Sequence, residues 1–225
     1  LARADVTASG TMTTFLPSLS LHTEIAPQTM LFMRYQQGFR PGGFAIEGDF
    51  VRRFRDDRTG TFEIGTRHGR PGSGPFDVAL SMSYTRWQDI QADFIDAIGL
   101  PSTANIGDGQ IWSASMTGGV RAGKGLRIEA GLTWNESKVD QPPILFAIRA
   151  RQVPNIAHVA GRIGINWSRE LGRGLELTSN GWTSYVGKSR LGIGPELGEA
   201  QGDYLDSGIN IRVGNQSTGI SLGVT

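Results

Sequence analysis

The chain has 225 residues, no cysteine and a formal net charge of +1. The absence of cysteine excludes disulfides, zinc–thiolate sites and a cysteine nucleophile, and the balanced charge gives no electrostatic basis for binding nucleic acid. The 32 glycines are about twice the average usage and indicate many turns rather than long helices. No apolar run reaches the ~18 residues that a membrane-spanning helix requires. The low mean hydropathy of −0.21 is nevertheless compatible with membrane strands, whose lipid-facing and lumen-facing residues alternate.

The dominant pattern along the chain has a period of two. Between Leu126 and Trp134 every second residue is apolar, and the intervening positions are mostly polar. This alternation is typical of strands with one apolar and one polar face. It predicts no helix and about ten strands, with boundaries good to about 2–4 residues: 13–25, 30–38, 60–69, 75–95, 107–121, 126–137, 156–167, 175–186, 204–213 and 218–225.

The connections between these strands alternate strictly between short and long. The short ones are rich in Gly, Pro, Asn and Ser, as tight turns require, and lie at 26–29, 69–74, 122–125, 168–174 and 214–217. The long ones lie at 39–60, 96–106, 138–155 and 187–203. In an antiparallel sheet this places all tight turns at one end and all long loops at the other, which is the layout of outer-membrane barrels.

A soluble β-sandwich or propeller also has short strands and polar turns, but it has less reason to keep such an alternation. Aromatic residues near the strand ends suit the girdles at the two membrane interfaces: Phe15, Tyr35, Trp112, Trp134, Trp167 and Tyr185. The sequence therefore predicts an all-β fold, an antiparallel up-and-down transmembrane β-barrel segment of about ten strands, with short periplasmic turns and long extracellular loops.

Five short strings along the chain form an ordered set. The most specific is YQQGFRPGGF at 35–44, where an aromatic residue precedes Gly-Phe-Arg-Pro at the end of a predicted strand. The others are FLPSLSL at 15–21, FEIG at 62–65, YTRWQDIQ at 84–91 and ANIGD at 104–108. In content, order and spacing these strings resemble the barrel of TonB-dependent receptors. No plug domain, TonB box or terminal aromatic strand is found, so the resemblance implies the C-terminal portion of a barrel of about 22 strands, lacking its final strands, with residues 1–225 as one partial domain.

The resemblance also implies a function and partners. In this family a plug occludes the barrel, and the TonB complex pulls on it to admit a scarce nutrient. The expected location is the Gram-negative outer membrane. The expected partners are outer-membrane lipid, the plug of the same full-length protein, the TonB complex through a missing N-terminal region, and a small-molecule cargo such as a ferric siderophore; nucleic acid and cofactors are not expected.

Ligand contacts are expected in the long loops. The 39–60 loop is rich in arginine and aromatic residues, and guanidinium groups pair with carboxylates or phosphates while aromatic rings stack on ligands. The alternative is a solvated loop whose arginines pair with its own aspartates. The candidate ligand-binding residues across the loops are Arg40, Phe44, Arg52, Arg53, Arg55, Gln91, Asn105, Arg149 and Arg151. A second group, by its phase along the strands, faces the lumen and either a plug or water: Arg34, Gln36, Glu63, Arg67, Arg127, Glu129, Arg162, Asn166 and Asn210.

Two other functions fit a ten-stranded outer-membrane barrel: a self-contained porin or adhesin, and a hydrolase. The sequence contains neither a G-x-S-x-G nor an H-E-x-x-H motif, and its three histidines are far apart, which argues against an enzyme. The glycine-rich segment at 192–198 lacks a following helix in this interpretation and contains Pro195, so it does not suit a phosphate loop. A cation site at Asp89, Asp93 and Asp96 competes with a solvated loop margin, which we favour.

Overall fold

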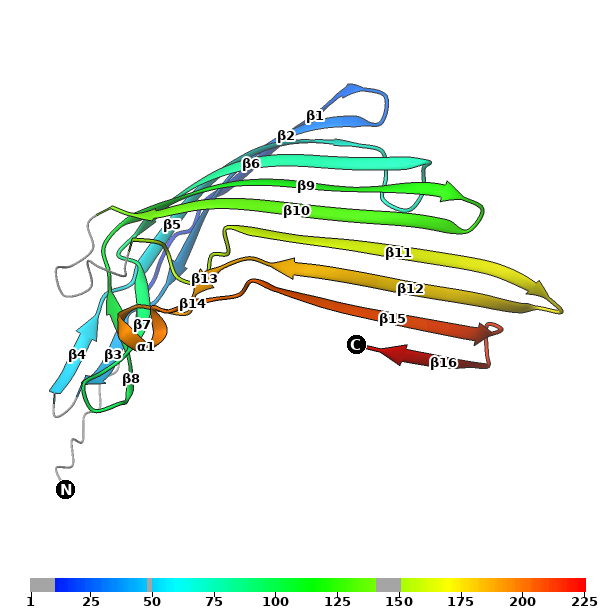
Figure 1. The fold of residues 1–225 in the computed structure, drawn as a ribbon. Coiled ribbons are helices and arrows are strands. Elements are labelled where there is room, and N and C mark those ends of the chain that lie inside the picture. Colours follow the sequence, from blue (N-terminus) through cyan, green and yellow to red (C-terminus); the bar gives the residue numbers. More distant parts are fainter. Residues whose placement is uncertain (1–10, 48–49, 141–150) are drawn as a thin grey trace.

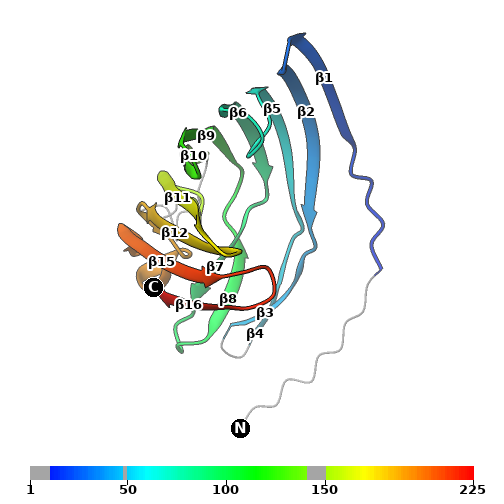
Figure 2. The same ribbon diagram turned by 90° about the vertical axis from the view of Figure 1, so that its right-hand side faces the viewer.

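The computed structural model describes residues 11–47, 50–140 and 151–225. Ten strands form one antiparallel sheet, and its spatial order is the chain order. These strands are β1 (Ser18–Ala26), β2 (Thr29–Arg40), β5 (Asp57–His68), β6 (Phe76–Gln88), β9 (Gly109–Gly123), β10 (Leu126–Val139), β11 (Val159–Gly172), β12 (Leu175–Val186), β15 (Tyr204–Gly214) and β16 (Gly219–Val224). Within the described ranges β1 and β16 are the two edges, and the sheet curls into a trough between them (Figure 2). The predicted strand number and the all-β, up-and-down fold class are confirmed.

The two ends of the sheet differ as the connection lengths predict. The tight turns β1–β2, β9–β10, β11–β12 and β15–β16 lie at one end, and the long loops gather at the other (Figure 1). Residues of the tight turns adopt left-handed backbone conformations, as at Gln28 with φ of 59° and Arg173 with φ of 54°. Polar residues tolerate this conformation better than β-branched ones, which explains the composition of these segments.

The long loops contain secondary structure that the alternation pattern does not predict. Three hairpins form there, from β3 (Gly43–Glu47) and β4 (Phe50–Phe54), β7 (Gln91–Ile95) and β8 (Pro101–Asn105), and β13 (Ser189–Arg190) and β14 (Ala200–Gln201). The predicted strand 75–95 is wrong in its last part, because Asp89 adopts a φ of 51° and the chain leaves the main sheet. One short helix also forms that the pattern does not predict, α1 (Gly194–Leu197), with Pro195 in its first turn, where proline is tolerated.

The helical content of the described residues is small. None of it is long and apolar enough to cross a membrane as a helix.

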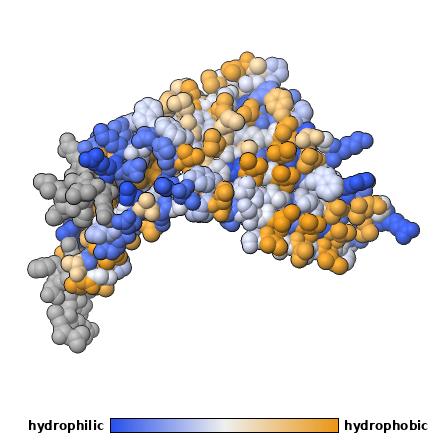
Figure 3. Space-filling view, in the orientation of Figure 1, coloured by the Kyte–Doolittle hydropathy of each residue, from blue (hydrophilic) through white to orange (hydrophobic). Residues whose placement is uncertain are grey.

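The two faces of the main sheet have opposite chemistry. Leu80, Met116 and Leu132 are neighbours on β6, β9 and β10, and all three side chains are exposed on the convex face. Hydrophobic side chains cover much of this face in the space-filling view (Figure 3). The polar residues assigned to the lumen, such as Arg34 and its partner Glu63, alternate with them and belong to the concave face. An apolar surface of this extent requires contact with lipid or protein.

Aromatic residues border this apolar surface at both ends. At the loop end, Tyr35, Phe62, Tyr84 and Trp112 occupy matching positions on four consecutive strands, and the Tyr84 and Trp112 rings lie 4.7 Å apart. At the turn end, Phe76 stacks on His68, and Trp167 pairs with the first residue of β10. Such belts are typical of the two interfaces of a membrane barrel. Of the other aromatics predicted for girdles, Trp134 and Tyr185 lie nearer the loop end and Phe15 precedes β1.

One ion pair on the concave face crosses an entire strand. The Arg127 guanidinium on β10 reaches over Gly119 of β9 and donates to the Asp77 carboxylate on β6 at 2.5 Å and to Glu129 at 2.7 Å. The side chains of Arg127 and Asp77 are only 14% and 10% exposed. A Cβ atom at position 119 would collide with the end of the guanidinium, so this glycine leaves the space through which the bridge passes.

We expect Gly119→Ala to displace Arg127 and to lower the free energy of unfolding by about 1–3 kcal/mol, the range for a broken buried ion pair or hydrogen bond. The measurement is urea-induced unfolding of the protein in lipid vesicles, followed by tryptophan fluorescence. Gly164→Ala is the matched control, because a Cβ atom there meets nothing within 4 Å. Equal losses for the two variants would contradict this role of Gly119.

Candidate ligand-binding site at the loop end

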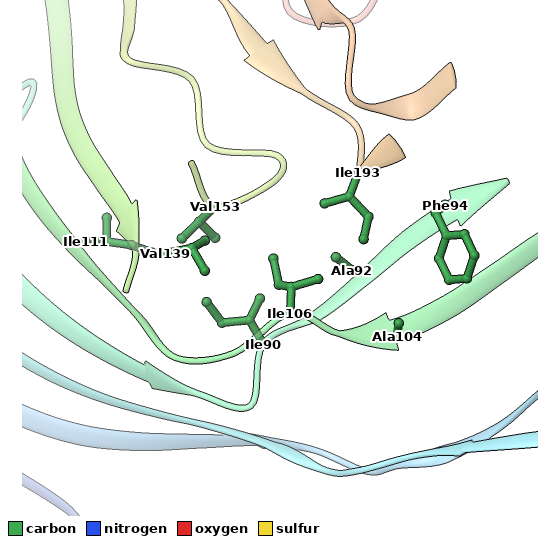
Figure 4. Packing of buried hydrophobic residues seen from close by; sticks show 9 residues of the cluster. All are labelled: Ile90, Ala92, Phe94, Ala104, Ile106, Ile111, Val139, Val153 and Ile193. Atoms are coloured by element: carbon green, nitrogen blue, oxygen red, sulfur yellow. The ribbon is translucent and has the colours of Figure 1, made fainter. Parts of the chain in front are cut away.

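The loops at the open end of the sheet share a hydrophobic core. Ile90 and Ile106 flank the β7–β8 hairpin, Ile193 comes from the β12–β15 loop, and all three are 0% exposed. Together with Val153 from the β10–β11 loop they pack against the wall, by which we mean the ten-stranded main sheet (Figure 4). Ile111 of β9 and Val139 of β10 belong to the wall and contribute to the same cluster. Three loops are therefore held together and anchored to the concave face, so they form a preorganised platform.

A buried carboxylate fixes the base of the β3–β4 hairpin. Asp57 is 2% exposed, and its Oδ2 accepts hydrogen bonds from Arg40 Nε at 3.0 Å, Arg40 Nη2 at 2.5 Å and the backbone N–H of Gln91 at 3.2 Å. The Arg40 guanidinium also donates to the Gln91 carbonyl at 2.9 Å and lies 5.9 Å from the Trp87 ring centroid. Charge-assisted hydrogen bonds of this kind are strong and directional, so this cluster joins the two hairpins.

Two side-chain amides complete the junction between the hairpins. Gln91 Nε2 donates to the carbonyls of Pro41 at 3.0 Å and Arg55 at 2.9 Å. Asn105 donates to the Arg55 carbonyl at 3.1 Å and the Asp89 carbonyl at 2.7 Å, and it accepts from the Arg55 N–H at 2.7 Å. These amide groups bind the protein backbone, which favours a positioning role for Gln91 and Asn105 over direct ligand contact.

The β3–β4 hairpin carries the exposed candidates. Phe44 is 52% exposed and pairs with Arg53 across the hairpin, while Arg52 pairs with the buried Ala45. Arg52 and Arg53 are exposed as well. Because successive side chains of a strand alternate between its faces, the structure places Phe44 beside Arg53 on one face of the hairpin and Arg52 on the other face, next to Ala45.

The remaining candidates differ in their surroundings. Arg55 is 71% exposed and forms an ion pair at 2.7 Å with Asp89, which lies outside the 39–60 loop. Arg151 is exposed on the β10–β11 loop, and its carbonyl accepts from the Val139 N–H at 3.0 Å. Arg149 lies outside the described residues.

The three aspartates of the alternative cation site, Asp89, Asp93 and Asp96, each have a different hydrogen-bond or ion-pair partner. Asp89 pairs with Arg55, Asp93 accepts from Thr103 at 2.8 Å, and Asp96 accepts from the N–H groups of Ile98 and Leu100 in the β7–β8 turn. In the part of the chain that the structure describes, no three metal-ligating side chains gather. The sequence interpretation missed Asp57 and Trp87, whose importance depends on partners far away in the chain.

Asp203, which precedes β15, is held by two partners at the loop end. The Tyr185 hydroxyl donates to its Oδ1 at 2.8 Å, and Lys188 Nζ lies 3.5 Å from its Oδ2. The hydrogen bond from Tyr185, followed by the charge of Lys188, lowers the pKa of Asp203 below its ordinary value. The contribution of Asp203 to this loop is therefore present above the unfolded-state pKa of about 4 and is lost as the pH falls through the lowered pKa.

We expect Tyr185→Phe to raise the pKa of Asp203 toward its ordinary value, because the largest cause of the shift is removed. The measurement is a carboxyl carbon NMR titration of aspartate-labelled protein, with the Asp203 signal assigned through Asp203→Asn. Tyr204→Phe serves as the control, since this nearby tyrosine is exposed. An unchanged Asp203 titration in Tyr185→Phe would show that the hydrogen bond is not the cause.

Comparison with known proteins finds similarity at the level of structure. No protein-family model and no curated protein sequence matches the chain. The ferric yersiniabactin uptake receptor FyuA from Yersinia pestis is 18% identical, with a TM-score of 0.69, covering 91% of this chain and 30% of that one. The copper transporter OprC is 14% identical, with a TM-score of 0.66 and coverage of 92% and 33%. The ferric preacinetobactin receptor BauA from Acinetobacter baumannii is 15% identical, with a TM-score of 0.62 and coverage of 92% and 30%.

The chain spans about a third of the length of these structures. At such low identity the similarity shows the fold. The predicted resemblance to TonB-dependent receptors and the outer-membrane type of fold are confirmed at this level: the ten strands have the fold of part of the β-barrel wall of TonB-dependent outer-membrane receptors.

Proposed function

We propose that the chain is one partial barrel domain of a receptor in the Gram-negative outer membrane that imports a scarce nutrient, such as a ferric siderophore, with energy from the TonB complex. The observation that carries this proposal is the combination of an apolar convex face between two aromatic belts with a concave face whose open end holds a packed loop platform. Structural neighbours named as uptake receptors and as a transporter support transport rather than catalysis.

The β3–β4 hairpin is our candidate for cargo contact. Ferric chelates of catecholate or carboxylate type are anionic and carry planar groups, which guanidinium groups and aromatic faces recognise. Phe44 and Arg53 share one face of this hairpin, Arg52 is exposed on its other face, and the exposed Arg55 follows β4. Arg40, Gln91 and Asn105 position this hairpin from below. Arg149 and Arg151 remain candidate contacts on the neighbouring loop.

Energy coupling is the second part of the proposal. A plug from the same full-length protein would occupy the concave side, and the TonB complex would act on it. An uptake that depends on the proton-motive force separates this receptor from a passive porin, because a porin admits solutes without energy.

The test is uptake of radioactive iron from a panel of ferric catecholate, hydroxamate and carboxylate chelates by cells that depend on this protein. We expect uptake from one of these classes, and its loss when a protonophore is added. Uptake that continues unchanged with the protonophore would reject the energised receptor in favour of a pore.

In the same assay, Arg52, Arg53 and Arg55 are replaced together by Ala. The expected loss of affinity is about 10- to 100-fold, equivalent to one charge-assisted hydrogen bond of about 1.5–3 kcal/mol. The matched control replaces Arg70, Lys124 and Arg169, three exposed cations at the turn end, and removes the same charge. Unchanged uptake and affinity in the loop variant would reject the hairpin as the cargo site.

A further inference from the structure

The concave face has a depression near one edge of the sheet, formed by β1, β2 and β5. These strands lie side by side (Figure 2). The depression has a volume of about 450 Å³. Its polar and aromatic lining consists of side chains that share the concave face, namely Ser20, His22, Phe32, Arg34, Glu63 and Arg67. It lies along the wall, away from the loop platform, so its residues belong to neither the hairpin nor the hairpin junction.

An aromatic ring forms the floor of this depression. Phe32 pairs with Gly65 across β2 and β5, and a Cβ atom at position 65 would collide with the end of the Phe32 ring. The missing side chain therefore allows the ring to lie against β5. His22 is the neighbour of Phe32 on β1. The result is an aromatic surface bordered by polar side chains, which suits a planar apolar group.

The charges around the ring are unbalanced. Arg34 forms an ion pair with Glu63 at 2.6 Å in the neighbouring row. On the opposite side of the ring, Arg67 pairs in register with Met30, is exposed, and has no hydrogen bond or ion pair with any residue that the structure describes. Among the side chains that line the depression, Arg67 therefore adds a positive charge to the Arg34–Glu63 pair. Glu24, in the same row on β1, is outside the lining, and its Oε1 accepts from the Gln28 N–H at 3.2 Å. The five N–H donors of the Arg67 guanidinium are therefore available to bind an anion.

We propose that this depression binds a small planar aromatic acid, with the ring against Phe32 and the carboxylate on Arg67. Its volume falls within the range of about 300–1,000 Å³ for small-molecule sites, which is more than one acidic side chain needs. Where the plug of the proposed receptor leaves this part of the concave face uncovered, the site would offer a cargo with this chemistry a second contact. That biological purpose rests on the proposed receptor function, whereas the binding itself does not.

The probe is 2-naphthoate, and its binding to the intact protein in detergent micelles is measured by equilibrium dialysis. We expect 2-naphthoate to bind at least 10-fold more tightly than the neutral 2-naphthamide, because only the acid can pair with the guanidinium. Arg67→Gln should weaken naphthoate binding at least 10-fold and leave naphthamide binding unchanged. Phe32→Leu should weaken the binding of both compounds, since both use the ring.

Arg162→Gln is the matched control, because Arg162 is on the same face at a distant strand, where its guanidinium lies 4.8 Å from the Trp182 ring centroid. We expect this variant to bind naphthoate within 2-fold of the unchanged protein. An equal loss in Arg162→Gln and Arg67→Gln would reveal general charge attraction and overturn the proposal. Equal affinity for the acid and the amide, or no binding of the acid at millimolar concentration, would overturn it as well.

Two further results separate the possible explanations. If naphthoate fails to bind and Arg67 is protected from modification by phenylglyoxal, a protein segment fills the depression and the proposal is wrong. If naphthoate binds as expected while iron uptake fails to depend on the protein, the site stands and the proposed receptor function falls.

Discussion

The structure depends on one constraint: the backbone N–H and C=O groups need hydrogen bonds between neighbouring strands. This need is strict because the side chains on one face of the sheet are in contact with an apolar environment. In hydrocarbon an unpaired backbone group costs several kcal/mol, so a wall of this kind is built from long antiparallel strands in continuous register. The ladder from β1 to β16 meets that need within the sheet. The period of two then assigns Leu80, Met116 and Leu132 to the convex face, and it assigns charged residues such as Arg34, Glu63 and Arg127 to the concave face.

The concave face follows different physics, since polar groups there need partners. Arg127 satisfies this by crossing over Gly119 to Asp77, and Arg34 by pairing with Glu63. At the loop end the same face is covered by apolar side chains, and Ile111 and Val139 of the wall become part of the loop core. The wall thus changes from polar to apolar where the loops dock, and the docked loops present the β3–β4 hairpin outward.

Local patterns predict the main sheet because a strand's faces are set by adjacent residues. Turn chemistry and alternation suffice for all ten strands and for the separation of turns from loops. They fail where long-range contacts decide: Asp89 ends β6 through its backbone conformation, and the loop hairpins depend on a core assembled from distant segments. The same reason explains Gln91 and Asn105, whose residue types suit ligand contacts but whose amides bind the backbone of the neighbouring hairpin.

The assignment of the convex face to lipid is the central claim, and site-directed spin labelling tests it directly. The chain has no cysteine, so single labels are introduced at Met82 and Met116 on the convex face and at Ser83 and Ser115 on the concave face. In membranes, the first two labels should be reached by oxygen and shielded from a water-soluble nickel complex, and the second two should show the opposite preference. Equal accessibility at adjacent positions such as 82 and 83 would contradict a membrane-spanning wall.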